Sequence, residues 1–181
     1  QLVEAGAGQR RRDLRRSVEA QVIVVMAGPD RDRESNLWGW LRDSLPSIPH
    51  KKHVQRIEDS TKGGTPDVEG MIEGGQPFWI ELKVAYEQVR SPVVRVKTTA
   101  QQVYFALKRT QVGGLSWYLI RVGKHPHRFH FLIPGELAEA LLDKPITLDW
   151  LHANSACDPK ASARDILMAA TRPKSGSTRT D

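Results

Sequence analysis

The chain has a single cysteine, Cys157, among its 181 residues. One cysteine excludes disulfide bonds within the chain, and it excludes a zinc site that needs several cysteines. Scarce cysteine is typical of proteins in a reducing compartment. We therefore expect a cytoplasmic protein.

The sequence also lacks long apolar stretches and a nucleotide-binding loop. Its longest apolar run, Val22 to Ala27, is far shorter than the roughly 20 residues that cross a bilayer, and shorter than the core of a signal peptide. No Gly-x-x-x-x-Gly-Lys motif is present. We expect no membrane partner and no nucleotide cofactor.

The composition is that of a globular protein with an excess of basic residues. Hydrophobic residues make up 39% and charged residues 27%, and 27 Lys and Arg against 21 Asp and Glu give a net charge of +6. This length suits one buried core. A positive charge favours a polyanionic partner, because binding releases the counterions of that polyanion. Nucleic acid is the first candidate.

The two ends of the chain differ from its middle. Residues 1–30 hold Arg10-Arg11-Arg12 and Arg15-Arg16 before a short apolar run. They fit either a nucleic-acid-binding arm or a solvated extension outside the fold, and we favour the extension. The expected organisation is an extension over 1–30, one domain over 31–171 and a flexible polar tail over 172–181.

Apolar periodicity and turn residues predict alternating helices and strands. Apolar residues at helical spacing after Glu34 predict a helix that Pro46 and Pro49 end. The expected strands cover residues 53–57, 65–70, 78–83, 116–122 and 128–133. Further helices are expected over 98–111, 134–142 and 161–170, with helical packing around Trp150 and Leu151. Gly74-Gly75 predicts that the second and third strands form a hairpin.

Two carboxylates in that hairpin can form a metal site. Asp67 and Glu81 lie fourteen positions apart, which is enough for two strands of about five residues and a short loop. The hairpin would bring both to one end, at a site that faces solvent. Mg²⁺ binds carboxylate, carbonyl and water oxygens, so the protein need supply only a few ligands.

Lys83 and Leu82 complete this constellation. Lys83 follows Glu81 by two residues, so both side chains point to the same face of the strand. Leu82 should point into the core, while its backbone carbonyl remains available as a metal ligand. The alternative is a turn residue at Asp67 and an ordinary surface ion pair between Glu81 and Lys83. The combined spacing favours the chemical interpretation.

The motifs resemble those of a known family. Gly64-Thr65-Pro66-Asp67 followed by Trp79-Ile80-Glu81-Leu82-Lys83 is similar to the PD-(D/E)XK nuclease superfamily, in particular its VRR-NUC type common in bacteriophages. That type also has a glutamate on a preceding helix and a glutamine on a following one. Glu34 and Gln102 match these two positions, and the resemblance covers about 34–133.

The resemblance implies a fold, a cofactor and residue roles. The fold would be α/β, with a restriction-endonuclease-like mixed central sheet flanked by helices. Asp67, Glu81 and the Leu82 carbonyl would hold Mg²⁺ or Mn²⁺, and Lys83 would assist the attacking water. Glu34 would complete a second metal position, and Gln102 would orient Lys83 or a phosphate. Ordinary alternatives are a glutamate favoured by the helix dipole and a solvated glutamine.

The expected function is that of a metal-dependent DNA endonuclease, selective for branched, flap or junction DNA. A protein encoded by a bacteriophage would act in the host cytoplasm, and a symmetric homodimer would place two sites on opposite strands. The alternatives are a non-catalytic basic nucleic-acid-binding protein and an RNA-directed nuclease of the same fold. A test for metal-dependent cleavage distinguishes a nuclease from a non-catalytic binding protein. Parallel digestion of DNA and RNA distinguishes a DNA-directed from an RNA-directed nuclease.

Basic side chains near the Pro-Asp strand are candidate nucleic-acid contacts. We name Lys51, Lys52, Arg56, Lys62 and Lys97, for which a solvated face is the alternative. His125, His127 and His130 surround Pro126 in an expected turn and lack metal-site spacing. They are interpreted as surface or DNA-contacting histidines.

Overall fold

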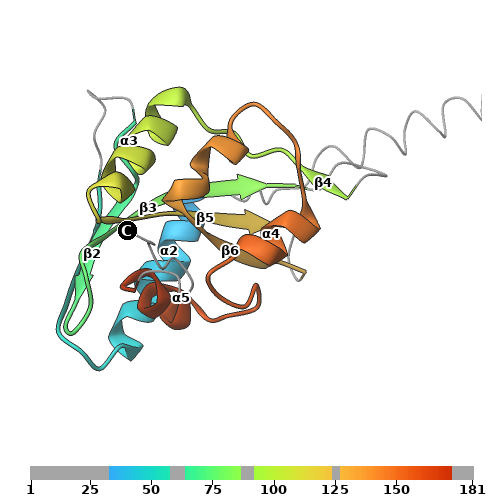
Figure 1. Cartoon of the computed structure of the whole chain (residues 1–181). Coiled ribbons are helices and arrows are strands. Elements are labelled where there is room, and N and C mark those ends of the chain that lie inside the picture. Colours follow the sequence, from blue (N-terminus) through green and yellow to red (C-terminus); the bar gives the residue numbers. More distant parts are fainter. Residues whose placement is uncertain (1–32, 58–63, 87–91, 124–126, 173–181) are drawn as a thin grey trace, which may run out of the picture. The chain divides into compact units, whose positions relative to one another are not determined.

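A five-stranded mixed sheet forms the centre of this computed structural model, which describes residues 33–57, 64–86, 92–123 and 127–172 (Figure 1). The strand order is β1-β2-β3-β5-β6. The strands are β1 (Lys52–Arg56), β2 (Val68–Ile72), β3 (Phe78–Ala85), β5 (Leu115–Val122) and β6 (Phe129–Pro134). Only β3 and β5 are parallel among these neighbours. The expected extension at 1–30, Lys62, His125 and the tail beyond residue 172 lie outside the described residues.

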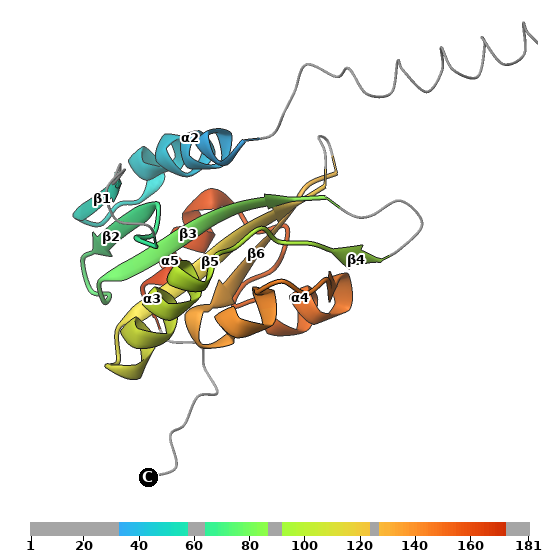
Figure 2. The same cartoon turned by 90° about the horizontal axis from the view of Figure 1, so that it is seen from above.

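Helices cover both faces of this sheet. Figure 2 shows the layers from above. The helices are α2 (Glu34–Ser44), η1 (Leu45–Ser47), α3 (Ala100–Gln111), η2 (Gly135–Leu141), α4 (Leu148–Asn154) and α5 (Ala163–Ala170). One core cluster joins α2 and α5 to the sheet, and a second joins α3, η2 and α4 to it. This is an α/β fold of restriction-endonuclease type, as expected.

The predicted helices and strands are confirmed, with two differences. Residues 135–141 form a 3₁₀ helix instead of an α-helix. Val93–Val94 (β4) pairs with Ile146–Thr147 (β7) in a small second sheet that we did not predict. Strands of two residues are too short to show an alternating pattern. None of the helices in the described ranges is long and apolar enough to span a membrane.

The hairpin of β2 and β3 determines where the site lies. Val68 pairs with Ile80, so Asp67, one residue before β2, lies across from Glu81 as predicted. The paired register of the two strands ends at Ile80, whereas β3 continues alongside β5 to Ala85. The second half of β3 is therefore open on the β2 side.

Candidate active site

Asp67 is held over the open half of β3 by two backbone contacts. Its Oδ2 accepts a hydrogen bond of 2.8 Å from the backbone N–H of Leu82. Its backbone carbonyl accepts another, also 2.8 Å, from the N–H of Ile57 next to β1. Where β2 has separated from β3, the Asp67 carboxylate thus accepts the hydrogen bond that the backbone of a neighbouring strand would otherwise accept.

The backbone carbonyl of Leu82 faces the same gap. The N–H and C=O of one strand residue point toward the same neighbouring strand. Because the Leu82 N–H points at Asp67, its carbonyl oxygen projects to that side as well. The Leu82 side chain is buried in the core cluster that includes α2 and α5, as predicted. The carbonyl can therefore supply a third oxygen beside Asp67 and Glu81.

Glu81 and Lys83 form a buried ion pair on the face of the sheet that α3 covers. Lys83 Nζ lies 2.6 Å from Glu81 Oε1. The two residues are only 4% and 6% exposed. Our expectation of a solvent-facing site is therefore wrong for Glu81, because α3 and the neighbouring Tyr118 of β5 cover its side chain.

Gln102 connects α3 to Glu81. Its side-chain N–H donates to Glu81 Oε1 at 2.5 Å. Its side-chain oxygen accepts hydrogen bonds from the Thr99 backbone N–H at 3.1 Å and from the Thr98 hydroxyl at 3.2 Å. A backbone N–H can only donate, so this network defines which end of the amide faces Glu81. The amide reaches Glu81, where we expected Lys83 or a phosphate.

Thr98 and Thr99 are site residues that our sequence reasoning missed. Thr99 caps α3, and its hydroxyl accepts from the Gln102 N–H at 3.3 Å. Thr99 and Gln102 together form a capping box, whose Thr-x-x-Gln pattern is visible in the sequence. That pattern could have shown that Gln102 begins a helix with its side chain turned back toward the N-terminus.

Glu34 reaches the same site from the first turn of α2. Its Oε1 lies 3.8 Å from Lys83 Nζ, and its side chain is 46% exposed. Partial burial raises the pKa of Glu34, and the negative charge of Asp67 raises it further, whereas Lys83 lowers it. The structure thus brings Glu34, Asp67, Glu81 and Lys83 together from three separate segments. The resemblance to the PD-(D/E)XK motifs implied this grouping.

The candidate active site holds more negative than positive charge. Burial raises the pKa of Glu81 to about 7, Lys83 opposes this shift, and Asp67 adds to it. Glu34 and Glu81 pair with the Lys83 ammonium, and Asp67 adds a third carboxylate to the same site. In addition, Glu81 Oε2 is buried and has no hydrogen-bond partner. An orphaned carboxylate oxygen of this kind is costly unless a cation binds it.

The oxygen donors fit a hard divalent ion. No group of three or more His, Cys, Asp or Glu side chains in the described part of the chain has metal-binding geometry. Asp67, Glu81 and the Leu82 carbonyl offer two carboxylates and one backbone oxygen instead. Mg²⁺ keeps several waters and needs only one or two protein carboxylates. The unpaired Oε2 of Glu81 is the observation that supports this fit.

The predicted basic contacts divide into two groups. Arg56 and Lys97 are exposed, and both charges lower the pKa of Glu34, so they lie near the site. Lys51 and Lys52 lie at the opposite end of β1, where Lys52 pairs with Ile72. Lys52 Nζ also donates to the Ile48 carbonyl at 2.9 Å. Of the predicted contacts that the structure describes, Arg56 and Lys97 are therefore the ones placed to meet a substrate at the carboxylates.

His130 is not a surface histidine, contrary to our interpretation. It belongs to β6, is buried, and its ring stacks on Trp40 at a centroid distance of 4.0 Å. Its Nε2 accepts a hydrogen bond of 3.3 Å from Arg121 Nε. Its closeness to Pro126 in the sequence suggested a turn, but β6 begins at Phe129. His127 is exposed at the rim of a neighbouring hollow.

Comparison with known proteins adds no family assignment. A scan against protein-family models and a search of curated proteins gave no match for this chain.

Proposed function

We propose that the chain is a divalent-metal-dependent nuclease that hydrolyses phosphodiester bonds in DNA. The observation that carries the proposal is the buried, unpaired Oε2 of Glu81 in a site shared with Asp67 and Lys83. Such a site has excess negative charge and one oxygen that needs a cation. The resemblance of the surrounding motifs to PD-(D/E)XK nucleases supports the same chemistry.

The metal would be held by Asp67, Glu81 and the Leu82 carbonyl. When bound, Mg²⁺ or Mn²⁺ supplies the positive charge that polarises a phosphodiester and makes water nucleophilic. Glu34, at the exposed rim, is suited to bind water or a second ion. Asp67 keeps its orientation through the Leu82 N–H, which leaves its second oxygen for the metal.

Lys83 and Gln102 have different tasks. The Lys83 ammonium lies between Glu81 and Glu34 and can donate to a water or to a phosphate oxygen that enters the site. Gln102 is a positioning residue, because its amide holds Glu81 while Thr98 and Thr99 hold the amide. A fixed carboxylate loses less freedom when it binds a metal.

The substrate and setting follow from charge and size. The net charge of +6, with Arg56 and Lys97 near the site, favours a polynucleotide over a small phosphodiester. A small domain recognises backbone geometry more readily than base sequence, so we propose branched, flap or junction DNA as substrate. Action in the cytoplasm, and a homodimer that pairs two sites, complete the proposal.

A cleavage assay tests this function. Purified protein is incubated with labelled duplex, flap and four-way-junction DNA, and with RNA of matched sequence, in Mg²⁺, Mn²⁺ or EDTA. We expect cleavage of DNA in either metal and none in EDTA. Binding without cleavage in any metal would support a non-catalytic binding protein instead. Cleavage of RNA alone would identify an RNA-directed nuclease.

A further inference from the structure

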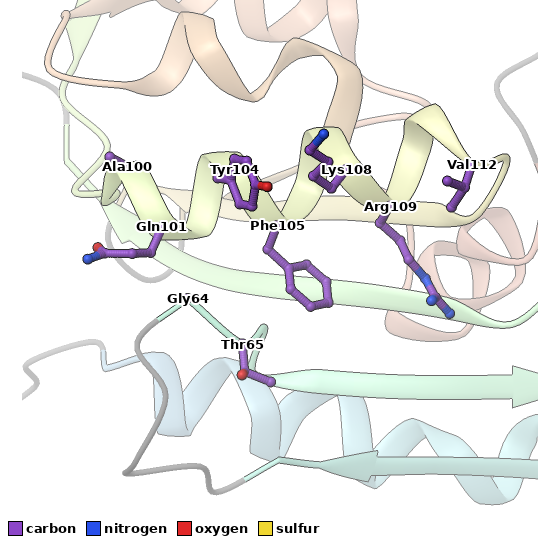
Figure 3. A pocket seen from close by; sticks show the side chains of 9 residues that line it. All are labelled: Gly64, Thr65, Ala100, Gln101, Tyr104, Phe105, Lys108, Arg109 and Val112. Atoms are coloured by element: carbon purple, nitrogen blue, oxygen red, sulfur yellow. The ribbon is translucent and has the colours of Figure 1, made fainter.

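A groove of about 850 Å³ runs along α3 on the side of the Gly64–Thr65 segment. Figure 3 shows Phe105 pointing from α3 toward Thr65, which lies on the opposite wall. Tyr104 and Lys108 line the groove one turn apart on the same helix. None of the residues of the candidate active site described above lines this groove.

The groove begins beside the candidate active site. Thr65 lies two residues before Asp67, and Gln101 precedes Gln102, whose amide binds Glu81. Gly64 has a φ of +105°, and a Cβ there would lie 2.8 Å from the Cβ of Gln101. This close contact joins the two walls next to the carboxylates. The groove therefore lies next to the candidate active site along α3.

The groove exposes aromatic surface that the fold does not use. Tyr104 is 63% exposed, which is unusual for a large ring on a helix that packs on a sheet. Phe105 contacts the edge of Trp79 at a centroid distance of 5.6 Å and thus has a fixed place in the wall. Exposed rings on a rigid helix are surfaces on which unpaired bases stack.

Two cations accompany these rings. Lys108 Nζ lies 5.6 Å from the centre of the Tyr104 ring. The Arg109 guanidinium lies 5.5 Å from the centre of the Trp79 ring, and its Nε is buried without a hydrogen-bond partner. The lining residues include these cations and no acid. Exposed aromatic surface with a cation over one ring face and no acid nearby is complementary to a polynucleotide strand.

We propose that this groove binds unpaired nucleotides of the strand that is cut, with a base on Tyr104 and phosphates at Lys108 and Arg109. The proposal rests on the proposed nuclease function and makes its substrate more specific. Inside a duplex each base face is already stacked on its neighbours, so an unpaired base can cover Tyr104 more readily than a paired one. The preferred substrate is therefore DNA with a single-stranded segment next to the scissile bond.

Binding measured without metal tests the groove. Fluorescent single-stranded oligothymidine, a blunt duplex and a duplex with a single-stranded tail are titrated with the full chain in EDTA, and Kd is read from anisotropy. Tyr104→Ala should weaken binding of the single strand and the tailed duplex about tenfold, with the blunt duplex changed less than about twofold. Tyr104→Phe keeps the ring and should restore binding.

Control variants outside the groove show whether a loss of binding comes from the groove itself or from removing any exposed apolar side chain or cation. Met71→Ala removes another exposed apolar side chain, and Lys144→Ala removes an exposed cation; neither residue lines the groove. Both should bind all three DNAs like the wild-type chain, whereas Lys108→Ala should weaken single-strand binding. Thermal unfolding confirms that each variant is folded.

The outcomes distinguish this proposal from the nuclease function. Unchanged single-strand binding by Tyr104→Ala, or an equal loss for the blunt duplex, would overturn the groove proposal while leaving cleavage of duplex DNA untouched. Conversely, wild-type protein that binds through Tyr104 but cleaves none of the three DNAs in Mn²⁺ would overturn the nuclease function. In that case the groove would bind single strands without serving cleavage.

Discussion

At the scale of single residues, Glu81 carries the strongest physical signature of the site. Its side chain is buried, one oxygen binds Lys83 and Gln102, and the other has no hydrogen-bond partner. Burial of a carboxylate penalises its charged form, which is why its pKa rises to about 7. An apolar residue at this position would leave the buried Lys83 ammonium without its carboxylate partner.

The raised pKa of Glu81 predicts how stability depends on pH. Without metal, the folded protein holds a proton on Glu81 more tightly than the unfolded chain, whose ordinary pKa is 4.5. This contribution is fully present below pH 4.5 and is lost as pH rises through about 7. From pH 5 to 8 in EDTA, the wild type should lose roughly 1 to 3 kcal/mol relative to Glu81→Gln.

Urea unfolding of both proteins at several pH values in EDTA measures this difference. The Gln side chain does not titrate, so subtraction removes the contributions of groups that are not coupled to Glu81. A constant difference between the two proteins across this range would show that Glu81 has an ordinary pKa.

Lys83 controls the proton on Glu81 as well as any substrate contact. Its positive charge lowers the pKa of Glu81, so Lys83→Met should raise that pKa further. A metal must then displace a proton at higher pH. We expect the pH midpoint of Mn²⁺ binding to move upward in Lys83→Met and to stay in place in Lys144→Met. Calorimetric titration with Mn²⁺ at a series of pH values measures this midpoint. An unmoved midpoint in Lys83→Met would contradict the effect of Lys83 on the pKa of Glu81.

At the scale of elements, the site depends on a close contact between the segment before β2 and the helix α3. Gly64 lets the segment before Asp67 pass directly over Gln101, since any Cβ there meets the helix. Gly64→Ala should displace Asp67 from Glu81 and abolish most cleavage, while the unfolding free energy falls by more than about 1 kcal/mol. Plasmid nicking and urea unfolding measure the two effects.

Gly74 offers a matched control for this substitution. It also has a positive φ, +82°, but open space surrounds the position of a Cβ. Gly74→Ala should therefore lose stability through backbone strain alone and keep its cleavage rate. Equal loss of cleavage in both variants would mean that strain, and not the contact with α3, explains the effect of Gly64→Ala.

The helix α2 contains a glycine that lowers its stability. Gly39 lies in its interior, and nothing lies within 4 Å of where a Cβ would be. Glycine in a helix costs about 0.5 to 1 kcal/mol relative to alanine. Gly39→Ala should thus raise the unfolding free energy by that amount in urea unfolding, with Glu34 still placed at the site. A loss of stability would indicate that the substitution disturbs how α2 packs.

Most of these elements could be predicted because their sequences are locally consistent. The spacing of Asp67 and Glu81, the glycines between them and the apolar residues of β3 predicted the hairpin and the position of both carboxylates at one end of it. β5 was equally clear, because its sequence is rich in aromatic and β-branched residues and follows Gly113-Gly114. The 3₁₀ form of η2 and the pairing of β4 with β7 depend on tertiary contacts and leave no periodic pattern.

At the scale of the whole molecule, burial of the site was the feature that the sequence did not reveal. In β3 the apolar residues Phe78, Ile80 and Leu82 alternate with others, which predicted one buried and one exposed face. Both faces are buried, because α3 crosses over Glu81 between β3 and β5. Which face a crossover helix covers is decided by packing of distant segments, as is the stacking of His130 on Trp40.

The proposed nuclease function requires both a metal ion and Asp67 for cleavage. The most direct measurement is the cleavage rate of an end-labelled, tailed DNA duplex in Mn²⁺ by wild type, Asp67→Asn and Asp43→Asn, an exposed aspartate outside the site. We predict cleavage by wild type and Asp43→Asn and a loss of at least about 1000-fold in Asp67→Asn, because that variant loses a charged ligand. Cleavage by Asp67→Asn at the wild-type rate, or none by the wild type, would contradict it.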